Sequence, residues 1–367
     1  MSIDQATWRR TRNLGLTAHD PERAYAGYTL YSPMYGDGSV YLLDMDGKAV
    51  HTWKMPYRPG DYGYLLPNGN LFYLGQTPET PQDDMFVGWQ LFSGGVLMEV
   101  DWDGNVVWEH RDPAHHHDGR RTASGGAVYL ALELVPPEVQ ERVQGGLPGS
   151  EHHGRMWADK VIEIDQDGNL LWEWHAYEHL DPATDVILPA DLRDEWSHGN
   201  TVVPLDNGDV IVSFRNPSVV ARIDRRTGGF AWKLTRPLLS VQHDPSQLDN
   251  GNVLIFNNGT RREMVPLVFS SVIEVDPATA NVVWEYRDNT AWLSFFSSYI
   301  SGAQRLPNGN TLITEGLTGR IFEVTPERDI VWEYVNPYFF TVPVFGMNNA
   351  VFRSRRYPPE LVEPKLR

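Results

Sequence analysis

Cysteine is absent from the 367-residue chain. Its absence excludes disulfide bonds, thiolate nucleophiles and metal sites with thiolate ligands. It does not indicate a compartment, because a protein without cysteine is stable in oxidising and in reducing surroundings. Any nucleophile or metal ligand must therefore come from other side chains, of which histidine, with 12 copies, is the most versatile.

Long apolar runs and basic clusters are also missing. No stretch approaches the roughly 18 apolar residues of a membrane-spanning helix, and 48 acidic against 31 basic residues give a net charge of −17. We therefore expect neither a membrane nor a nucleic acid as partner. The N-terminus lacks the apolar segment and cleavage site of a signal peptide. We expect a cytoplasmic protein, and a periplasmic location is the alternative if an export signal is removed during maturation.

What the chain does have is a tryptophan repeat. In each copy an acidic turn separates two short β-rich runs, as in EVDWDGNVVW, EIDQDGNLLW and EVTPERDIVW. The tryptophans that close the copies, spaced about 48 to 64 residues apart, are Trp53, Trp108, Trp172, Trp232, Trp284 and Trp332. Periods of about 50 residues are typical of propellers and arrays. We expect these indoles to pack between neighbouring repeats.

A second phrase follows every tryptophan and completes the repeat. Examples are NTVVPLDNGDVIVSF and SGAQRLPNGNTLITEG, each with two short strands around an Asn-Gly type turn. Four strands per period make one propeller blade. The sequence therefore predicts an all-β fold, a six-bladed β-propeller with four-stranded blades.

The two ends of the chain indicate how the ring closes. Residues 28–54 supply only the outer strands of a first blade, and the late segment VFGMNNAVFRSRRY resembles its missing inner strand. We predict that a C-terminal strand near residues 345–353 pairs with the N-terminal strands, which removes exposed sheet edges. The chain then divides into an N-terminal extension (1–27), a single propeller domain (28–357) and a C-terminal tail (358–367).

Three connections are longer than a hairpin needs. They span residues 133–158, with a short helix expected between Pro137 and Gly145, residues 175–197, and, more briefly, residues 258–270. Long loops on a compact scaffold are usually binding loops or lids. We expect the first two to act as lid insertions over one face of the ring.

Histidines recur where the inner strands begin. We compare the repeats by counting back from the residue that precedes each Asn-Gly type turn. Five positions before that residue, successive repeats carry Asp61, His117, Asn200, His243 and Ser301. Seven positions before it, two of the repeats carry His115 and His198. Inner strands enter a propeller near its axis, so these side chains are expected to converge in one axial pocket. Pockets with several convergent polar groups are the first place to look for a site.

Two kinds of chemistry suit such a cluster. Imidazoles from His115, His117, His198 and His243 are able to ligate zinc, copper or iron, with Asp61 as a further ligand or base. Alternatively, a histidine acts as nucleophile or general acid/base beside an arginine that binds an anion. Arginines available for that role are Arg215, Arg261 and Arg262.

Three of the repeats, WSHGNTVVPLDNGDVIVSFRN, SVQHDPSQLDNGNVLIFNNGTRR and FFSSYISGAQRLPNGNTLITEG, resemble the bacterial arylsulfotransferase family of six-bladed propellers, over residues 40 to 357. The resemblance implies transfer of a sulfuryl group between phenols through a sulfated histidine, without a nucleotide donor. It places His198 and His243 in the site, with Arg261 or Arg262. The sequence departs from the family in having no histidine after His243, and Ser301 stands at the matching position.

Our interpretation of the sequence is an arylsulfotransferase-like enzyme that acts on a phenolic or aromatic small molecule. The residues expected to carry catalysis are His198, His243 and Arg262, and those expected to bind substrate are Asp61, His117, Arg215, Arg261, Tyr299 and Ser301. This reaction needs no cofactor. The alternatives are a metal-dependent oxidoreductase, lyase or hydrolase with a divalent metal on the four histidines named above, and a binding propeller without catalysis. The sequence assigns no oligomeric state.

Overall fold

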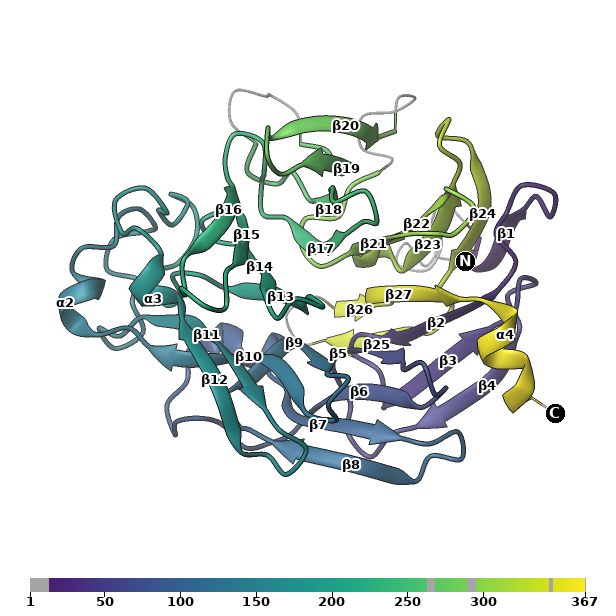
Figure 1. The fold of residues 1–367 in the computed structure, drawn as a ribbon, viewed down its shortest axis with the longest axis horizontal. Helices are drawn as coiled ribbons and strands as arrows, with labels where there is room; N and C mark the ends of the chain where they lie inside the picture. Colours follow the sequence, from purple (N-terminus) through teal and green to yellow (C-terminus); the bar gives the residue numbers. More distant parts are fainter. Residues whose placement is uncertain (1–12, 263–267, 289–294, 343–345, 367) are drawn as a thin grey trace, which may run out of the picture.

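The computed structural model describes residues 13–262, 268–288, 295–342 and 346–366. Six antiparallel sheets stand around a central axis as the blades of a propeller (Figure 1). In chain order, and from the axis outward, the first three blades are β27 (Val351–Tyr357), β2 (Tyr28–Pro33), β3 (Ser39–Leu43) and β4 (Ala49–Lys54); β5 (Pro59–Leu65), β6 (Leu71–Gln76), β7 (Gly95–Val100) and β8 (Val106–Arg111); and β9 (His115–Arg121), β10 (Ala127–Leu134), β11 (Trp157–Ile164) and β12 (Leu170–His175).

The remaining three blades repeat the same order. They are β13 (Gly199–Pro204), β14 (Val210–Phe214), β15 (Val219–Ile223) and β16 (Phe230–Leu234); β17 (His243–Gln247), β18 (Val253–Asn257), β19 (Ser271–Asp276) and β20 (Asn281–Tyr286); and β21 (Gly302–Arg305), β22 (Thr311–Glu315), β23 (Arg320–Val324) and β24 (Ile330–Val335). The predicted six-bladed propeller with four-stranded blades is confirmed.

The ring closes through the C-terminal strand, as the sequence predicts. β27 pairs antiparallel with β2, from Tyr28 opposite Tyr357 to Pro33 opposite Val351. The closing strand begins later than expected, because part of the predicted segment belongs to a small hairpin of β25 (Phe340–Val342) and β26 (Gly346–Asn348). Reciprocal amide bonds fix the base of this hairpin: Asn349 Nδ2 donates to the Asn336 carbonyl at 2.7 Å, and Asn336 Nδ2 donates to the Asn349 carbonyl at 2.9 Å.

A strand from the N-terminal segment extends the last blade. β1 (Gly15–His19) pairs antiparallel with β24, so that this sheet has five strands. Nearby, the Tyr25 backbone N–H donates to Glu323 Oε1 at 2.7 Å. Figure 1 shows β1 and the C-terminal helix α4 (Pro359–Val362) on the same side of the ring.

Indole hydrogen bonds join neighbouring blades. In five of the interfaces a tryptophan on the outermost strand donates its Nε1–H to a carbonyl in the outer hairpin turn of the next blade: Trp53 to Asp101 (3.0 Å), Trp108 to Gln166 (2.8 Å), Trp174 to Gly228 (2.8 Å), Trp284 to Pro326 (3.0 Å) and Trp332 to Met45 (2.9 Å). In the third blade the donor is Trp174 and not the repeat residue Trp172, which lies under the guanidinium of Arg225.

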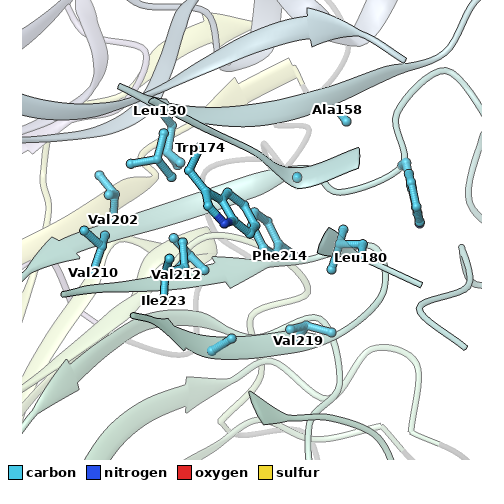
Figure 2. Packing of buried hydrophobic residues seen from close by; sticks show 14 of the residues in the cluster. Leu130, Ala158, Trp174, Leu180, Val202, Val210, Val212, Phe214, Val219 and Ile223 are labelled. Carbon is cyan, nitrogen blue, oxygen red and sulfur yellow. The ribbon is translucent and has the colours of Figure 1, made fainter. Parts of the chain in front are cut away.

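Apolar side chains fill the wedges between blades. Figure 2 shows the wedge between the third and fourth blades, where the Trp174 and Phe214 rings lie nearly parallel with centroids 6.0 Å apart. Val212 and Ile223 are completely buried beside them. Each such side chain stabilises the fold by about 1.5–3 kcal/mol relative to an exposed one. The rigid framework that positions the axial residues comes from these wedges.

The helices in the described part of the chain are short and lie in connections or after β27. They are α2 (Pro137–Gln140), α3 (Ala176–His179), α4 (Pro359–Val362) and the 3₁₀ helices Val87–Leu91, Gly316–Thr318 and Glu363–Lys365. α2 lies at the position expected for a short helix. In the described ranges no helix is long and apolar enough to cross a membrane.

Buried charges block the axis of the ring. Arg353 of β27 is fully buried, with Nη1 3.0 Å from Asp118 Oδ2 and Nε 3.2 Å from Asp244 Oδ1. Arg355 also binds Asp244, with Nη1 2.9 Å from Oδ2. Burial alone would raise the pKa of Asp118, but the nearby Arg120 and Arg353 lower it by a larger amount. The net result is a pKa below the usual value of an aspartate. This layer of ion pairs separates the two faces of the ring.

Candidate functional site

A cavity of about 970 Å³ lies on one face of the ring, above the layer of ion pairs. Its apolar side includes Phe86, Phe92 and Ile300. Residues of both long insertions line it as well, in the segments 149–153 and 191–195. The predicted convergence is seen for three histidines, since His117, His198 and His243 come from three different blades and line this one cavity.

His198 is oriented by a glutamate. It directly precedes β13 in a left-handed conformation (φ 48°), and its Nδ1 lies 2.7 Å from Glu195 Oε2. A carboxylate at Nδ1 holds the proton on that nitrogen and leaves the Nε2 lone pair available. Among the described residues no partner binds Nε2. The ring edge packs against Phe92, with centroids 4.7 Å apart.

His117 lies beside His198. The two ring centroids are 4.9 Å apart at 74°, and Phe92 stacks on His117 at 4.6 Å. Burial, followed by the neighbouring His198, lowers the pKa of His117 well below its usual value. The ring is therefore neutral at pH 7. A left-handed backbone (φ 52°) at His117 interrupts the strand alternation of β9 and turns this ring toward the cavity.

His243 has both ring nitrogens engaged. Nδ1 lies 2.8 Å from Asn258 Oδ1, and the Ile300 backbone N–H donates to Nε2 at 3.2 Å. The amide oxygen and the N–H fix the neutral tautomer that carries its proton on Nδ1. Burial lowers the pKa of His243 well below its usual value. A nucleophile needs a free lone pair, so this geometry suits a positioning role better than attack.

Two arginines line the cavity around one carboxylate. Arg261 Nη2 lies 3.1 Å from Asp191 Oδ1, and Arg215 Nη1 lies 4.0 Å from Asp191 Oδ2. Arg261 Nε is buried and has no hydrogen-bond partner among the described residues. Burial also lowers the pKa of Arg215. A single carboxylate does not saturate two guanidinium groups, so there are donors for an anionic ligand.

Arg262, by contrast, does not line the cavity. Its Nη2 donates to Ser271 Oγ at 3.0 Å, and its guanidinium stacks on Phe269 at 4.3 Å. The sequence analysis expected Arg262 to carry catalysis and Arg261 to bind substrate. The structure instead brings Arg261 to the histidines and leaves Arg262 outside the cavity lining.

The other predicted residues divide in the same way. Tyr299 lines the cavity, and burial raises its pKa. His115 is buried against Tyr129 between blades, where burial lowers its pKa to about 3. Ser301 accepts a hydrogen bond from the Gly316 backbone N–H at 3.0 Å. Asp61 lies behind the cavity wall, where burial raises its pKa well above the usual value. These last three contribute to the walls and not to the cavity surface.

The described residues do not bring the four predicted metal ligands together, because His115 faces away from the cavity. The one group of three with donor atoms within 4.8 Å of one another in the described ranges is Asp84, His152 and His153, at the cavity rim. Asp84 Oδ2 there already binds Arg155 Nη2 at 2.9 Å. A guanidinium at this distance competes with a cation for the carboxylate.

Several site residues were missed by the sequence analysis. Glu195 and Asp194 come from an insertion, Asp159 from β11, and His116 is the middle residue of the HHH run. Burial, followed by the charge of Glu195, raises the pKa of Asp194, which lines the cavity, to about 6. None of the four stands in the repeat register that drew attention to the other histidines. The HHH run was the only signal available for His116.

A second cavity, of about 1050 Å³, opens on the opposite face of the ring. It contains Arg121, Arg305 and Arg355, each paired with a carboxylate. None of the described residues that line it is a histidine. Arg305 Nε there is buried without a hydrogen-bond partner among the described residues, as Arg261 Nε is in the first cavity, so it is the imidazoles that distinguish the two cavities. The histidine cavity is therefore the better candidate for chemistry.

Comparisons with known proteins agree with this architecture. A model of the arylsulfotransferase (ASST) family matches residues 82–337. No curated protein matches the chain. The structure of a protein of unknown function from Bacteroides caccae is 12% identical, with 91% of this chain and 100% of that chain covered and a TM-score of 0.53. A streptogramin B lyase (10% identity, 94% and 93% covered, TM-score 0.49) and the β-propeller domain of Cps50 (Swd1) from Myceliophteria thermophila (10%, 93% and 97%, 0.49) are also similar. At 12% identity, the Bacteroides caccae structure shows only that the fold is shared.

Proposed function

The chain belongs to the arylsulfotransferase family, and from that premise we propose that it transfers a sulfuryl group between phenolic small molecules in the histidine cavity. The observation that carries the proposal is the Glu195–His198 pair, 2.7 Å apart, in a cavity that also contains Arg215 and Arg261. This set combines an activated imidazole with donors for an anion.

His198 is the nucleophile in this proposal. In the first half of the reaction, its Nε2 lone pair forms a bond to the sulfur of an aryl sulfate, and the bond from sulfur to the phenolic oxygen breaks. The departing oxygen leaves with the electron pair as a phenolate. Glu195 keeps the imidazole oriented and stabilises the positive charge that develops on it. His243 is not a nucleophile in this proposal, because both of its ring nitrogens are hydrogen-bonded, to Asn258 and to the Ile300 backbone N–H. Its role is to hold these two residues in position.

The arginines and the aromatic wall account for the substrate class. Arg261, with its unpaired Nε, and Arg215 are suited to the sulfuryl oxygens, because guanidinium groups bind oxyanions with paired N–H donors. Phe92 and Tyr299 line the cavity and offer aromatic contact surface to the leaving group. Neither role requires a metal or an organic cofactor.

The proposal is tested with 4-nitrophenyl sulfate as donor and phenol as acceptor. We expect release of 4-nitrophenolate that depends on the acceptor, and a mass gain of about 80 Da on the peptide with His198 when the donor is supplied alone, as covalent catalysis requires. His198→Gln should lower the transfer rate by about 10³-fold or more, since it removes the nucleophile.

The chain offers a matched control. His175 Nδ1 lies 2.9 Å from Glu133 Oε1, a pair of the same kind outside the cavity. His175→Gln should leave transfer unchanged. If no aryl sulfate reacts and no label is found, the binding propeller without catalysis replaces this proposal. Activity that depends on added metal would instead favour the metal-dependent alternative.

A further inference from the structure

We propose that His117 is the base that accepts the proton of the acceptor phenol, and that a proton relay through His116 to Asp159 supports it. The inference rests on the proposed function for its substrate class, but the relay itself rests on geometry. His116 Nδ1 lies 2.8 Å from His117 Nδ1, and His116 Nε2 lies 3.1 Å from Asp159 Oδ1. His116 and Asp159 are fully buried, and only His117 reaches the cavity.

The contacts determine which nitrogens carry protons. Burial alone raises the pKa of Asp159, but the neighbouring His116 and the hydrogen bonds from Ser197 and the Gly199 N–H outweigh it and keep the group a carboxylate. His116 Nε2 and Asp159 Oδ1 lie 3.1 Å apart without aligned hydrogen-bond geometry, and neither atom has another partner among the described residues. A carboxylate beside His116 Nε2 requires the proton on that nitrogen. His116 Nδ1 is then an acceptor, so His117 must donate its Nδ1–H to it. His117 Nε2 remains as a lone pair, and no described residue binds it.

The far end of the relay is held rigidly. Asp159 Oδ2 accepts the Gly199 backbone N–H at 2.7 Å and the hydroxyl of Ser197, and Ser197 Oγ in turn accepts the Asp159 N–H at 2.8 Å. A Cβ on Gly199 would come within 2.3 Å of Asp159 Oδ1. Ser197 and Gly199 flank His198, so the carboxylate that ends the relay also fixes the segment that carries the nucleophile.

The arrangement fits the second half of the transfer. The phenol O–H bond breaks and its proton goes to His117 Nε2. The oxygen forms a bond to the sulfur held on His198, and the N–S bond breaks with its electron pair returning to His198 Nε2. The Nδ1–H of His117 shifts to His116, and the Nε2–H of His116 shifts toward Asp159. In the next cycle the same proton returns to the departing phenolate, so protons balance over one turnover.

The relay has a readout that a structural role would not produce. His116→Asn keeps an amide near His117 but cannot pass a proton. With weakly acidic acceptors such as phenol it should lower the rate about 10²- to 10³-fold, the usual contribution of a positioned base. With acidic acceptors, already ionised at neutral pH, the loss should be less than about tenfold, because no base is needed. Asp159→Asn should show the same dependence on acceptor acidity.

The control is His115→Asn, on the same strand and equally buried but outside the relay. Any loss that it causes should be equal for all acceptors. A loss in His116→Asn that is likewise equal for all acceptors would overturn the relay.

A second measurement does not depend on activity or on variants that fold. Nitrogen NMR of wild-type protein with labelled histidine should show the proton of His117 on Nδ1 and that of His116 on Nε2. A reversed tautomer at either ring overturns the relay. If NMR shows the predicted tautomers but the protein transfers no sulfuryl group, the proposed function is overturned, and a phenol is then not the proton donor. The relay itself would still stand.

Discussion

Arg353 and Asp118 are 235 residues apart in the chain, and their side chains meet at 3.0 Å on the axis of the ring. One residue lies on the closing strand β27 and the other on β9, two blades away. The pair therefore joins the end of the chain to the blade that carries His117. It also forms the floor that supports the histidine cavity.

The first prediction concerns this pair. Arg353→Met removes the cation that Asp118 and Asp244 share, while Arg120 and Arg355 still contact them. Loss of one partner from a buried ion pair costs about 3–5 kcal/mol, and we expect the lower end of that range here. Chemical denaturation should show a decrease in unfolding free energy of that size. Arg23→Met, which removes an exposed pair with Asp20, serves as the control and should have little effect. Equal stability of the two variants would contradict the importance of the axial layer.

A second prediction tests the indole bonds between blades. Trp332→Phe keeps most of the apolar surface but removes the N–H that reaches the Met45 carbonyl at 2.9 Å. The half-buried Met45 carbonyl loses its partner, so stability should fall by about 1–2 kcal/mol. Trp172→Phe is the matched control, since no described acceptor binds that indole. Calorimetric melting of both variants distinguishes the two cases.

The third prediction follows from the raised pKa of Asp194. This carboxyl is neutral below about pH 6 and charged above it. The charge that appears in the cavity repels an anionic donor, so KM for an aryl sulfate should rise about fivefold between pH 5 and pH 7. Asp194→Asn should remove this rise. The same shift predicts a loss of stability as pH increases from about 4 to 6, because the folded state retains a proton that the unfolded chain has released.

The fourth prediction separates two histidines that the sequence could not rank. His243→Asn preserves a donor toward Asn258 and should lower transfer less than about tenfold, whereas His198→Gln should lower it about 10³-fold. The reason is that His243 has no free nitrogen, while His198 Nε2 is available. Labelling with an aryl sulfate should persist in His243→Asn. If labelling is lost in His243→Asn and retained in His198→Gln, then His243 is the nucleophile and His198 is not.

The fifth prediction concerns metals. The proposed transfer uses no ion, so a chelator should leave the rate unchanged, and elemental analysis should find no stoichiometric metal in active protein. His153→Ala alters the rim group of Asp84, His152 and His153. The transfer rate of this variant should equal that of the wild type, both with and without the chelator. Inactivation by the chelator, with recovery on adding zinc, would contradict the proposed mechanism.

The sequence predicted the blades and the convergence of histidines because both depend on a repeat. A repeat indicates which positions are equivalent, and equivalent positions on inner strands must lie near the axis. It did not predict that His115 turns away from His117, since that depends on the left-handed backbone at His117 and on irregular pairing between β9 and β10. Strand alternation alone would place the two on the same face.

Other parts had no local signal at all. β1 is a short segment, GLTAH, outside the repeat, and only the free edge of β24 gives it a partner. Asp159 and His116 meet because β11 and β9 belong to the same sheet, with β10 between them. Both of these contacts depend on the folded ring and not on any pattern along the chain. Glu195, by contrast, stands only three residues before His198, a local pairing that the repeat did not point to.

The closing strand also has a consequence for biosynthesis. β2 leaves the ribosome long before its inner neighbour β27. The first sheet therefore remains incomplete, with one edge of β2 unpaired, until the five other blades and β27 have been made. Bringing such distant segments together is slow, and open strand edges bind other chains. The nascent protein is consequently exposed to aggregation until β27 emerges, and a chaperone that covers the edge of β2 would protect it during that time.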